Sequence, residues 1–206
     1  MHRKLWWLFA CLWCAVAGVA SAQAQEVSGQ SRLLWQLLDY VGVDYGGAVE
    51  IGVIASEGEY AEMLDFTATA QKQIAALPEH PQRAALAQQI AQLQQAVHDK
   101  AAADQVAELA HGAAASLVQA YPFPMAPAFV PNLTQGAQLY AQQCASCHGA
   151  NGDGNGPAAA GLEPPPIAFT DSERADARSL AALYQVISQG VEGTSMTDYS
   201  HLPEED

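Results

Sequence analysis

The chain is poor in cysteine and in basic residues, and each shortage excludes a class of protein. Its 206 residues include 4 cysteines, and two of these, Cys11 and Cys14, lie in an apolar run at the N-terminus. A small secreted scaffold held by disulfides uses more pairs than this. Lys and Arg number 8 against 22 acidic residues, which gives a formal net charge of −14. Nucleic acid and anionic membrane surfaces are therefore disfavoured as partners, while cationic protein patches are favoured. Plain solubility is the alternative reading of this acidity.

Long apolar runs are also missing, and the short one stands at the start of the chain. Leu5–Ala17 follows a basic N-terminus and is too short to span a membrane comfortably. Ala20-Ser21-Ala22 is a small-residue cleavage site, so residues 1–22 predict a secretory signal peptide, with an uncleaved anchor as the alternative. We therefore expect an exported, periplasmic protein that loses Cys11 and Cys14 with its signal.

Residues 23–120 predict an all-α bundle of about four helices. Apolar residues recur there at three- and four-residue steps, which is the period of an amphipathic helix. The four stretches are marked by Leu34, Leu37, Leu38 and Val41; by Tyr60, Met63, Leu64, Thr67, Ala70, Ile74 and Leu77; by Leu86, Ile90, Leu93 and Val97; and by Val106, Ala110, Ala113 and Leu117. Asp44-Tyr45-Gly46-Gly47 predicts a turn after the first stretch. Residues 121–131 are rich in proline and predict an extended linker to a second domain, residues 132–206.

The second domain carries the pattern Cys144-Ala145-Ser146-Cys147-His148. This Cys-x-x-Cys-His spacing is the signature of c-type haem attachment. Two thiols three positions apart can each form a thioether with one porphyrin, and the adjacent imidazole can bind its iron. A redox dithiol or half of a zinc site is the alternative, but no second cysteine pair remains after cleavage to complete a zinc tetrahedron.

Three motifs extend this pattern: CASCHGANGDGNGP, the proline-rich GLEPPP-x-x-F and GTSM. With them, residues 132–206 resemble the class I c-type cytochromes. The resemblance implies one covalent haem c held by Cys144 and Cys147, with His148 as proximal and Met196 as distal ligand. It also implies an electron carrier rather than an enzyme, exchanging electrons with protein partners. The domain departs from these cytochromes in two ways. Thr197 stands where proline commonly follows the methionine, and the usual C-terminal helix is lacking, so we expect a truncated domain in which Pro203 and the acids after it open a further helix.

The distal ligand has a physical argument of its own. Met196 and His201 are the ligand candidates downstream of the haem motif, and a glycine- and serine-flanked loop around Met196 lets the backbone approach a haem edge. A methionine can also simply fill space in a hydrophobic core, and His201 remains the alternative ligand. On the proximal side, we expect the carbonyl of Pro165 or Pro166 to accept a hydrogen bond from His148, unless the prolines form a simple turn.

The segments Val43–Val49, Gly52 and Glu59–Met63 carry a second resemblance. The whole chain is similar to bacterial proteins in which a periplasmic helical domain and a cytochrome c precede a membrane iron permease of the oxidase-dependent high-affinity family. This resemblance implies an alternative function, a redox or iron-handling module of such a permease. The chain would then be a fragment, tethered to the inner membrane through a region after Asp206. A gas or ligand sensor with an open distal position is a third reading.

Glu108 and His111 have the Glu-x-x-His spacing that di-iron bundles use. On a helix with Val106 at 0°, Glu108 and His111 fall at about 200° and about 140°, opposite the apolar face. The pattern therefore predicts a solvated helix face rather than inward-facing iron ligands.

Overall fold

The computed structural model describes the backbone of residues 3–191 and 193–203, and the side chains of residues 24–203 except Glu173 and Glu192. The chain divides into two compact units, Met1–Phe123 and Pro124–Asp206. The residues after Pro203, where the sequence predicts that a further helix opens, lie outside the described residues.

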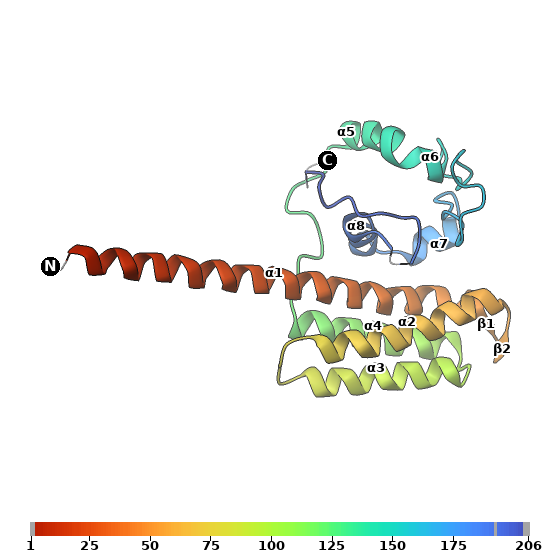
Figure 1. Ribbon diagram of the computed structural model, residues 1–206. Helices are drawn as coiled ribbons and strands as arrows, with labels where there is room; N and C mark the ends of the chain where they lie inside the picture. Colours follow the sequence, from red (N-terminus) through yellow and green to blue (C-terminus); the bar gives the residue numbers. More distant parts are fainter. Residues whose placement is uncertain (1–2, 192, 204–206) are drawn as a thin grey trace. The chain divides into compact units, whose positions relative to one another are not determined.

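The first unit is the predicted four-helix bundle. Its helices are α1 (Arg3–Ala48), α2 (Glu57–Ala76), α3 (Arg83–His98) and α4 (Ala103–Ala120). α1 packs against α2 and α4, and α3 packs against the same two helices, so α1 and α3 lie on a diagonal (Figure 1). Short connections between successive helices give the up-and-down order typical of such bundles.

The bundle core is built from the four apolar stretches of the sequence. At least three residues of each stretch are buried, among them Leu34, Leu38, Met63, Ile74, Leu86, Ile90, Val106 and Leu117. Ala70, Ala110 and Ala113 are buried as well, so small residues line much of the interior. At Gly42 of α1, an added Cβ would lie 3.3 Å from the Cβ of Ala110. α1 and α4 therefore approach closely where Gly42 meets Ala110.

Buried tyrosines join the helices to the connections between them. Their hydroxyl groups donate to main-chain carbonyls: Tyr45 to Ala101 at 3.0 Å, Tyr60 to Val97 at 3.2 Å and Tyr121 to Pro78 at 2.7 Å. Each bond satisfies a carbonyl at a helix end or in a connection. Burial raises the pKa of Tyr45 and of Tyr121, because the charged phenolate is poorly solvated there.

The turn predicted at Asp44–Gly47 is wrong, because α1 continues through Ala48. Burial of Tyr45 and Ala48 in the core outweighs the low helix propensity of two glycines. The chain reverses after α1 in a hairpin of β1 (Val49–Glu50) and β2 (Val53–Ile54), with Glu50 paired to Val53. The fold is therefore mostly helical rather than purely so.

The first half of α1 extends beyond the other helices of the bundle (Figure 1). The predicted signal peptide, residues 1–22, falls in this part, except for residues 1–2, which lie outside the described residues. Within the described ranges, no helix combines the length and the apolar character needed to cross a membrane.

The second unit consists of short helices and long loops. It contains α5 (Leu133–Leu139), a π-helical turn η1 (Tyr140–Cys144), α6 (Ala145–His148), α7 (Ser172–Ala177) and α8 (Leu180–Gln189). Side-chain caps begin three of these helices: Asn132 for α5, Asp171 for α7 and Ser179 for α8.

The proline-rich segment contributes to both units. Tyr121 and Phe123 are buried in the first unit, where Phe123 packs edge-on against Trp35 at 6.5 Å. In the second unit, the carbonyl of Pro124 accepts a hydrogen bond of 2.8 Å from the amide of Gln185 on α8. The segment predicted as a linker is therefore partly folded: the first unit ends within it and the second unit begins within it.

Candidate functional site

The residues of the Cys-x-x-Cys-His motif lie on two consecutive turns of helix. Cys144 is the last residue of the π-helical turn, and Cys147 and His148 end α6, where Gly149 stops the helix with a φ of 81°. π-helical turns are rare and concentrate at functional sites. Both cysteines are half-buried free thiols. Burial, and then the neighbouring Cys147, raise the pKa of Cys144, so this group is a thiol at neutral pH.

The imidazole of His148 is held from two directions. Its Nδ1 lies 3.2 Å from the carbonyl oxygen of Ile167, and its ring stacks on Phe169 with centroids 4.6 Å apart and an angle of 17° between the planes. The carbonyl partner is therefore Ile167, rather than the predicted Pro165 or Pro166, because the chain reaches the ring only after the last proline. When Nδ1 donates this bond, Nε2 keeps its lone pair for a metal.

The glycine-rich loop folds back onto the motif. The amides of Gly154 and Gly156 donate to the carbonyls of His148 and Cys147, at 2.8 and 3.1 Å. A Cβ at Gly156 would lie 2.2 Å from the carbonyl oxygen of Ser146, which is backbone and cannot turn away. The close approach therefore requires glycine at this position.

Tyr140 anchors the same loop. Its hydroxyl group donates to the carbonyl of Gly149 at 2.7 Å, and its ring meets Phe169 edge-on at 6.5 Å. Burial raises the pKa of Tyr140, and the neighbouring Cys144 and Asp153 add to this shift.

Met196 lies in the loop after α8, and hydrogen bonds fix its backbone. Its carbonyl accepts from the amide of Val191 at 2.9 Å, and its amide donates to the hydroxyl of Thr194 at 3.1 Å. Gly190 has a φ of 71°, and a Cβ there would lie 2.6 Å from the carbonyl oxygen of Met196. The hydroxyl of Tyr199 donates to the carbonyl of Gln143 at 3.3 Å, which ties this loop to the turn that carries Cys144.

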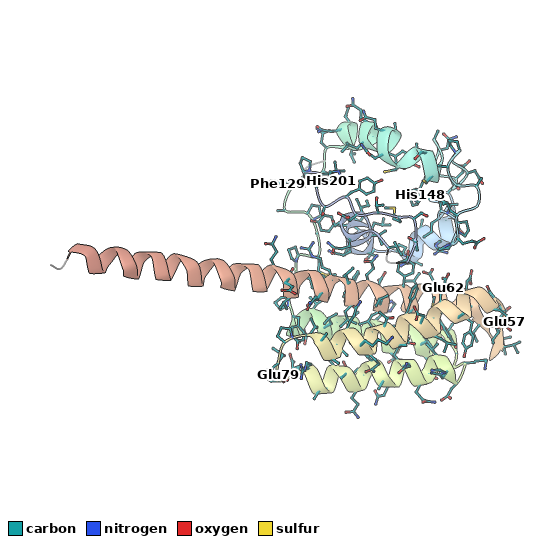
Figure 2. The ribbon with its side chains drawn as sticks, viewed as in Figure 1. Glu57, Glu62, Glu79, Phe129, His148 and His201 are labelled. Carbon is teal, nitrogen blue, oxygen red and sulfur yellow. The ribbon has the colours of Figure 1, made fainter. Side chains whose placement is uncertain are left out.

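His201, the other downstream candidate, is exposed, whereas Met196 is half-buried. Figure 2 shows His148 at the end of α6 and His201 toward the opposite side of the same unit. The bond to the segment carrying the motif comes from Tyr199, whose ring also lies 6.0 Å from that of His201.

The donor set of this unit fits a haem c. It offers two free thiols, an imidazole with Nε2 available and a thioether on a hydrogen-bonded loop, which are the groups that c-type haem uses. It does not fit a closed metal site: in the described part of the chain, no group of three or more His, Cys, Asp or Glu side chains could hold a metal ion.

Glu108 and His111 are both exposed on α4, while Val106 and Ala110 face the core. A Cβ at Gly42 would lie 2.8 Å from Nε2 of His111, so the histidine ring covers the surface of α1. The Glu-x-x-His pair therefore does not point into the bundle.

Four residues at the site were missed or misassigned from the sequence: Ile167, Phe169, Gly190 and Tyr199. The phenylalanine was visible as the last residue of the GLEPPP-x-x-F motif, but its stacking on the histidine was not. The contacts of the other three depend on the path of loops, which sequence periodicity does not reveal.

Comparison with known protein families gives two matches along the chain. The family model described as iron permease-associated 4-helix bundle domain matches residues 20–124, about half of the chain. The family model described as cytochrome C oxidase, cbb3-type, subunit III matches residues 131–206. No curated protein and no solved structure matches.

Proposed function

Because the chain belongs to the family of iron permease-associated four-helix bundle domains and continues into a cbb3-type cytochrome c domain, we propose that it is a periplasmic mono-haem electron carrier. A cytochrome c domain implies electron transfer through haem, and Cys144 and Cys147 imply that the haem is covalently bound. The proposal adds the ligands, the location and the domain limits: a signal peptide over 1–22, the bundle over 23–120 and the cytochrome over 132–206, joined by 121–131.

In this proposal, Cys144 and Cys147 would hold the haem by thioethers, and His148 and Met196 would bind its iron. A haem bound there supplies an iron that gains and loses one electron. The protein would supply position: Ile167 and Phe169 orient the imidazole, and the loop hydrogen-bonded to Val191 and Thr194 presents the thioether. A methionine ligand gives a higher reduction potential than a second imidazole would.

The arrangement around His148 is the observation that carries the proposal. Its Nδ1 is engaged by the Ile167 carbonyl at 3.2 Å, and the ring plane is set by Phe169, so Nε2 is the nitrogen left to bind iron. Hydrogen bonding of the outer nitrogen fixes the orientation and raises the basicity of a ligating histidine.

The test of covalent attachment is the double variant Cys144→Ala, Cys147→Ala, exported by a host that matures c-type cytochromes. We expect the wild-type protein to keep its colour after extraction with acidified acetone and the variant to lose it. Ser146→Ala, an exposed change between the two cysteines, is the control. A colourless wild-type protein, or haem that survives in the double variant, contradicts the proposal.

The distal ligand is tested by Met196→Ala against His201→Ala. Met196→Ala should remove the weak far-red absorbance band of methionine-ligated ferric haem, and His201→Ala should leave it unchanged. The reverse result assigns the ligand to His201.

The family of the first domain favours a second candidate, a redox or iron-handling module of a membrane iron permease. Iron uptake through that permease, measured with radioactive iron, should then fall in cells carrying the Cys144→Ala, Cys147→Ala variant. Uptake equal to that of the wild type would leave the chain as a free electron carrier.

A further inference from the structure

We propose that the hairpin between α1 and α2 docks the bundle onto the iron permease, with Ile51 and Val53 entering an apolar socket rimmed by cationic side chains. This inference rests on the permease association proposed above and names the surface that would make it.

The hairpin presents its apolar side chains to solvent. Ile51 is 96% exposed and Val53 is 68% exposed, and they are the large hydrophobic residues that stay exposed in the described part of the bundle unit. Val49, in the paired strand, is buried against the bundle. The base of the hairpin is thus fixed while its tip stands clear, at the end of the bundle where α1 meets α2 (Figure 1).

The backbone at the tip is strained. A two-residue hairpin turn of this kind needs positive φ at both central residues, which is why Asn-Gly and Asp-Gly are preferred there. Gly52, with a φ of 75°, meets this need, but Ile51 has a φ of 51°. A β-branched side chain in the left-handed region is a rare outlier, and such strain concentrates at functional sites. Isoleucine contributes nothing to the core here, so an interaction outside the unit accounts for it.

The surroundings of the tip are acidic. Glu50, Glu57 and Glu59 are all exposed, and Figure 2 shows Glu57 next to the hairpin. The connection between α3 and α4 lies beside the turn, because a Cβ at Gly52 would be 3.9 Å from the carbonyl oxygen of Lys100. The ammonium group of Lys100 lies 5.5 Å from the centre of the Tyr60 ring, over the bundle.

An apolar tip with an acidic rim complements an apolar pocket with a basic rim. The same rim opposes insertion into anionic lipid, whose surface attracts basic segments. A protein socket is therefore the occupant that the charges favour, and a lipid surface is the alternative to be tested.

Site-specific photocrosslinking tests the contact in the full chain. Benzoylphenylalanine is placed at position 53, and at position 75 as the control, since Ala75 is exposed near the far end of α2. In host membranes that contain an affinity-tagged iron permease, irradiation should join chain and permease from position 53 and not from position 75. Crosslinks to lipid or to a second copy of the chain, equal crosslinking at both positions, or no crosslink at all would overturn the proposal.

Substitutions separate docking from a structural role. Ile51→Asn and Val53→Thr should each reduce the permease recovered with the chain at least tenfold. Ile51→Asn should also raise the Tm of the isolated chain by about 2–4 °C, because asparagine tolerates the left-handed region. Lys100→Asn is the matched control: Lys100 has a φ of 52° at the same end of the bundle, and its replacement removes the cation over the Tyr60 ring but no apolar side chain of the hairpin tip. Its permease recovery should not fall below the wild-type level.

A lower Tm in Ile51→Asn with normal permease recovery would show a structural role and overturn the docking proposal. The haem content of each variant is measured in parallel. A coloured wild-type chain that never crosslinks to the permease contradicts docking alone, whereas a colourless one contradicts the electron-transfer function.

Discussion

At the scale of single residues, Phe169 fixes the plane of the His148 ring. We expect Phe169→Leu to free this ring, because the stack contributes about 0.5–1.5 kcal/mol beyond the area it buries. In the apoprotein, the NMR signals of the His148 ring protons should move downfield as the shielding by the phenyl ring is lost. Phe169→Tyr keeps the ring and should keep the shielded positions. Unchanged shifts in Phe169→Leu would mean that the stack does not persist in solution.

Two glycines of the Met196 loop offer a matched comparison. Gly190 and Gly193 both have positive φ, at 71° and 79°, but a Cβ would meet the Met196 backbone only at Gly190, and nothing within 4 Å at Gly193. Gly193→Ala should therefore lower the free energy of unfolding only by the cost of a left-handed backbone at a residue with a Cβ, about 1–2 kcal/mol. Gly190→Ala should lower it further and weaken the far-red band of the haem-loaded protein. Denaturant unfolding followed at the haem absorbance measures both, and equal losses would contradict the packing argument.

Much of the site is predictable at this scale because covalent chemistry is local in sequence. Cys144, Cys147 and His148 are adjacent, and the attachment reaction requires that spacing. The support from Ile167 is not predictable, because a shift of one residue in the chain after the prolines would place a different carbonyl beside the imidazole. The tie from Tyr199 to Gln143 spans 56 residues and leaves no periodic signal.

At the scale of elements, the tyrosine bonds give the bundle a pH dependence. The pKa of Tyr45 lies above its usual 10.0 because burial disfavours the phenolate. The folded state thus holds this proton more tightly than the unfolded state. The corresponding stability is fully present below about pH 10 and is lost as the pH rises through the folded pKa.

Tyr45→Phe should remove that alkaline loss, although it costs about 1 kcal/mol at neutral pH through the bond to Ala101. Urea unfolding of variant and wild type at neutral pH and above about pH 10 measures both effects. If the free energies of unfolding of variant and wild type fall in parallel above that pH, the assignment to Tyr45 is contradicted.

The buried faces of the helices were predictable from the sequence. Four apolar stripes predicted four helices, and the stripes are the buried faces. The boundary after α1 was misplaced because Gly46 and Gly47 suggested a turn that the packing of Ala48 overrides. The left-handed isoleucine beyond it was not foreseeable, since turn preferences favour asparagine or aspartate at that position.

At the scale of the whole molecule, the net charge of −14 predicts a salt dependence for the electron transfer proposed above. The second-order rate with a small cationic redox protein should fall about tenfold or more between low and physiological ionic strength, as screening removes the long-range attraction. Stopped-flow reduction measures this rate, with an uncharged quinol as the reference whose rate should stay flat. A rate that rises with salt would mean that partners avoid the acidic surface.

The small residues at the α1–α4 contact leave little room for substitution in either direction. A side chain can hardly be shortened at Gly42 or Ala110, and a longer one would force the two helices apart. Descendants of this chain can therefore vary their outer faces freely, while this contact keeps its glycine and alanine or the helices separate.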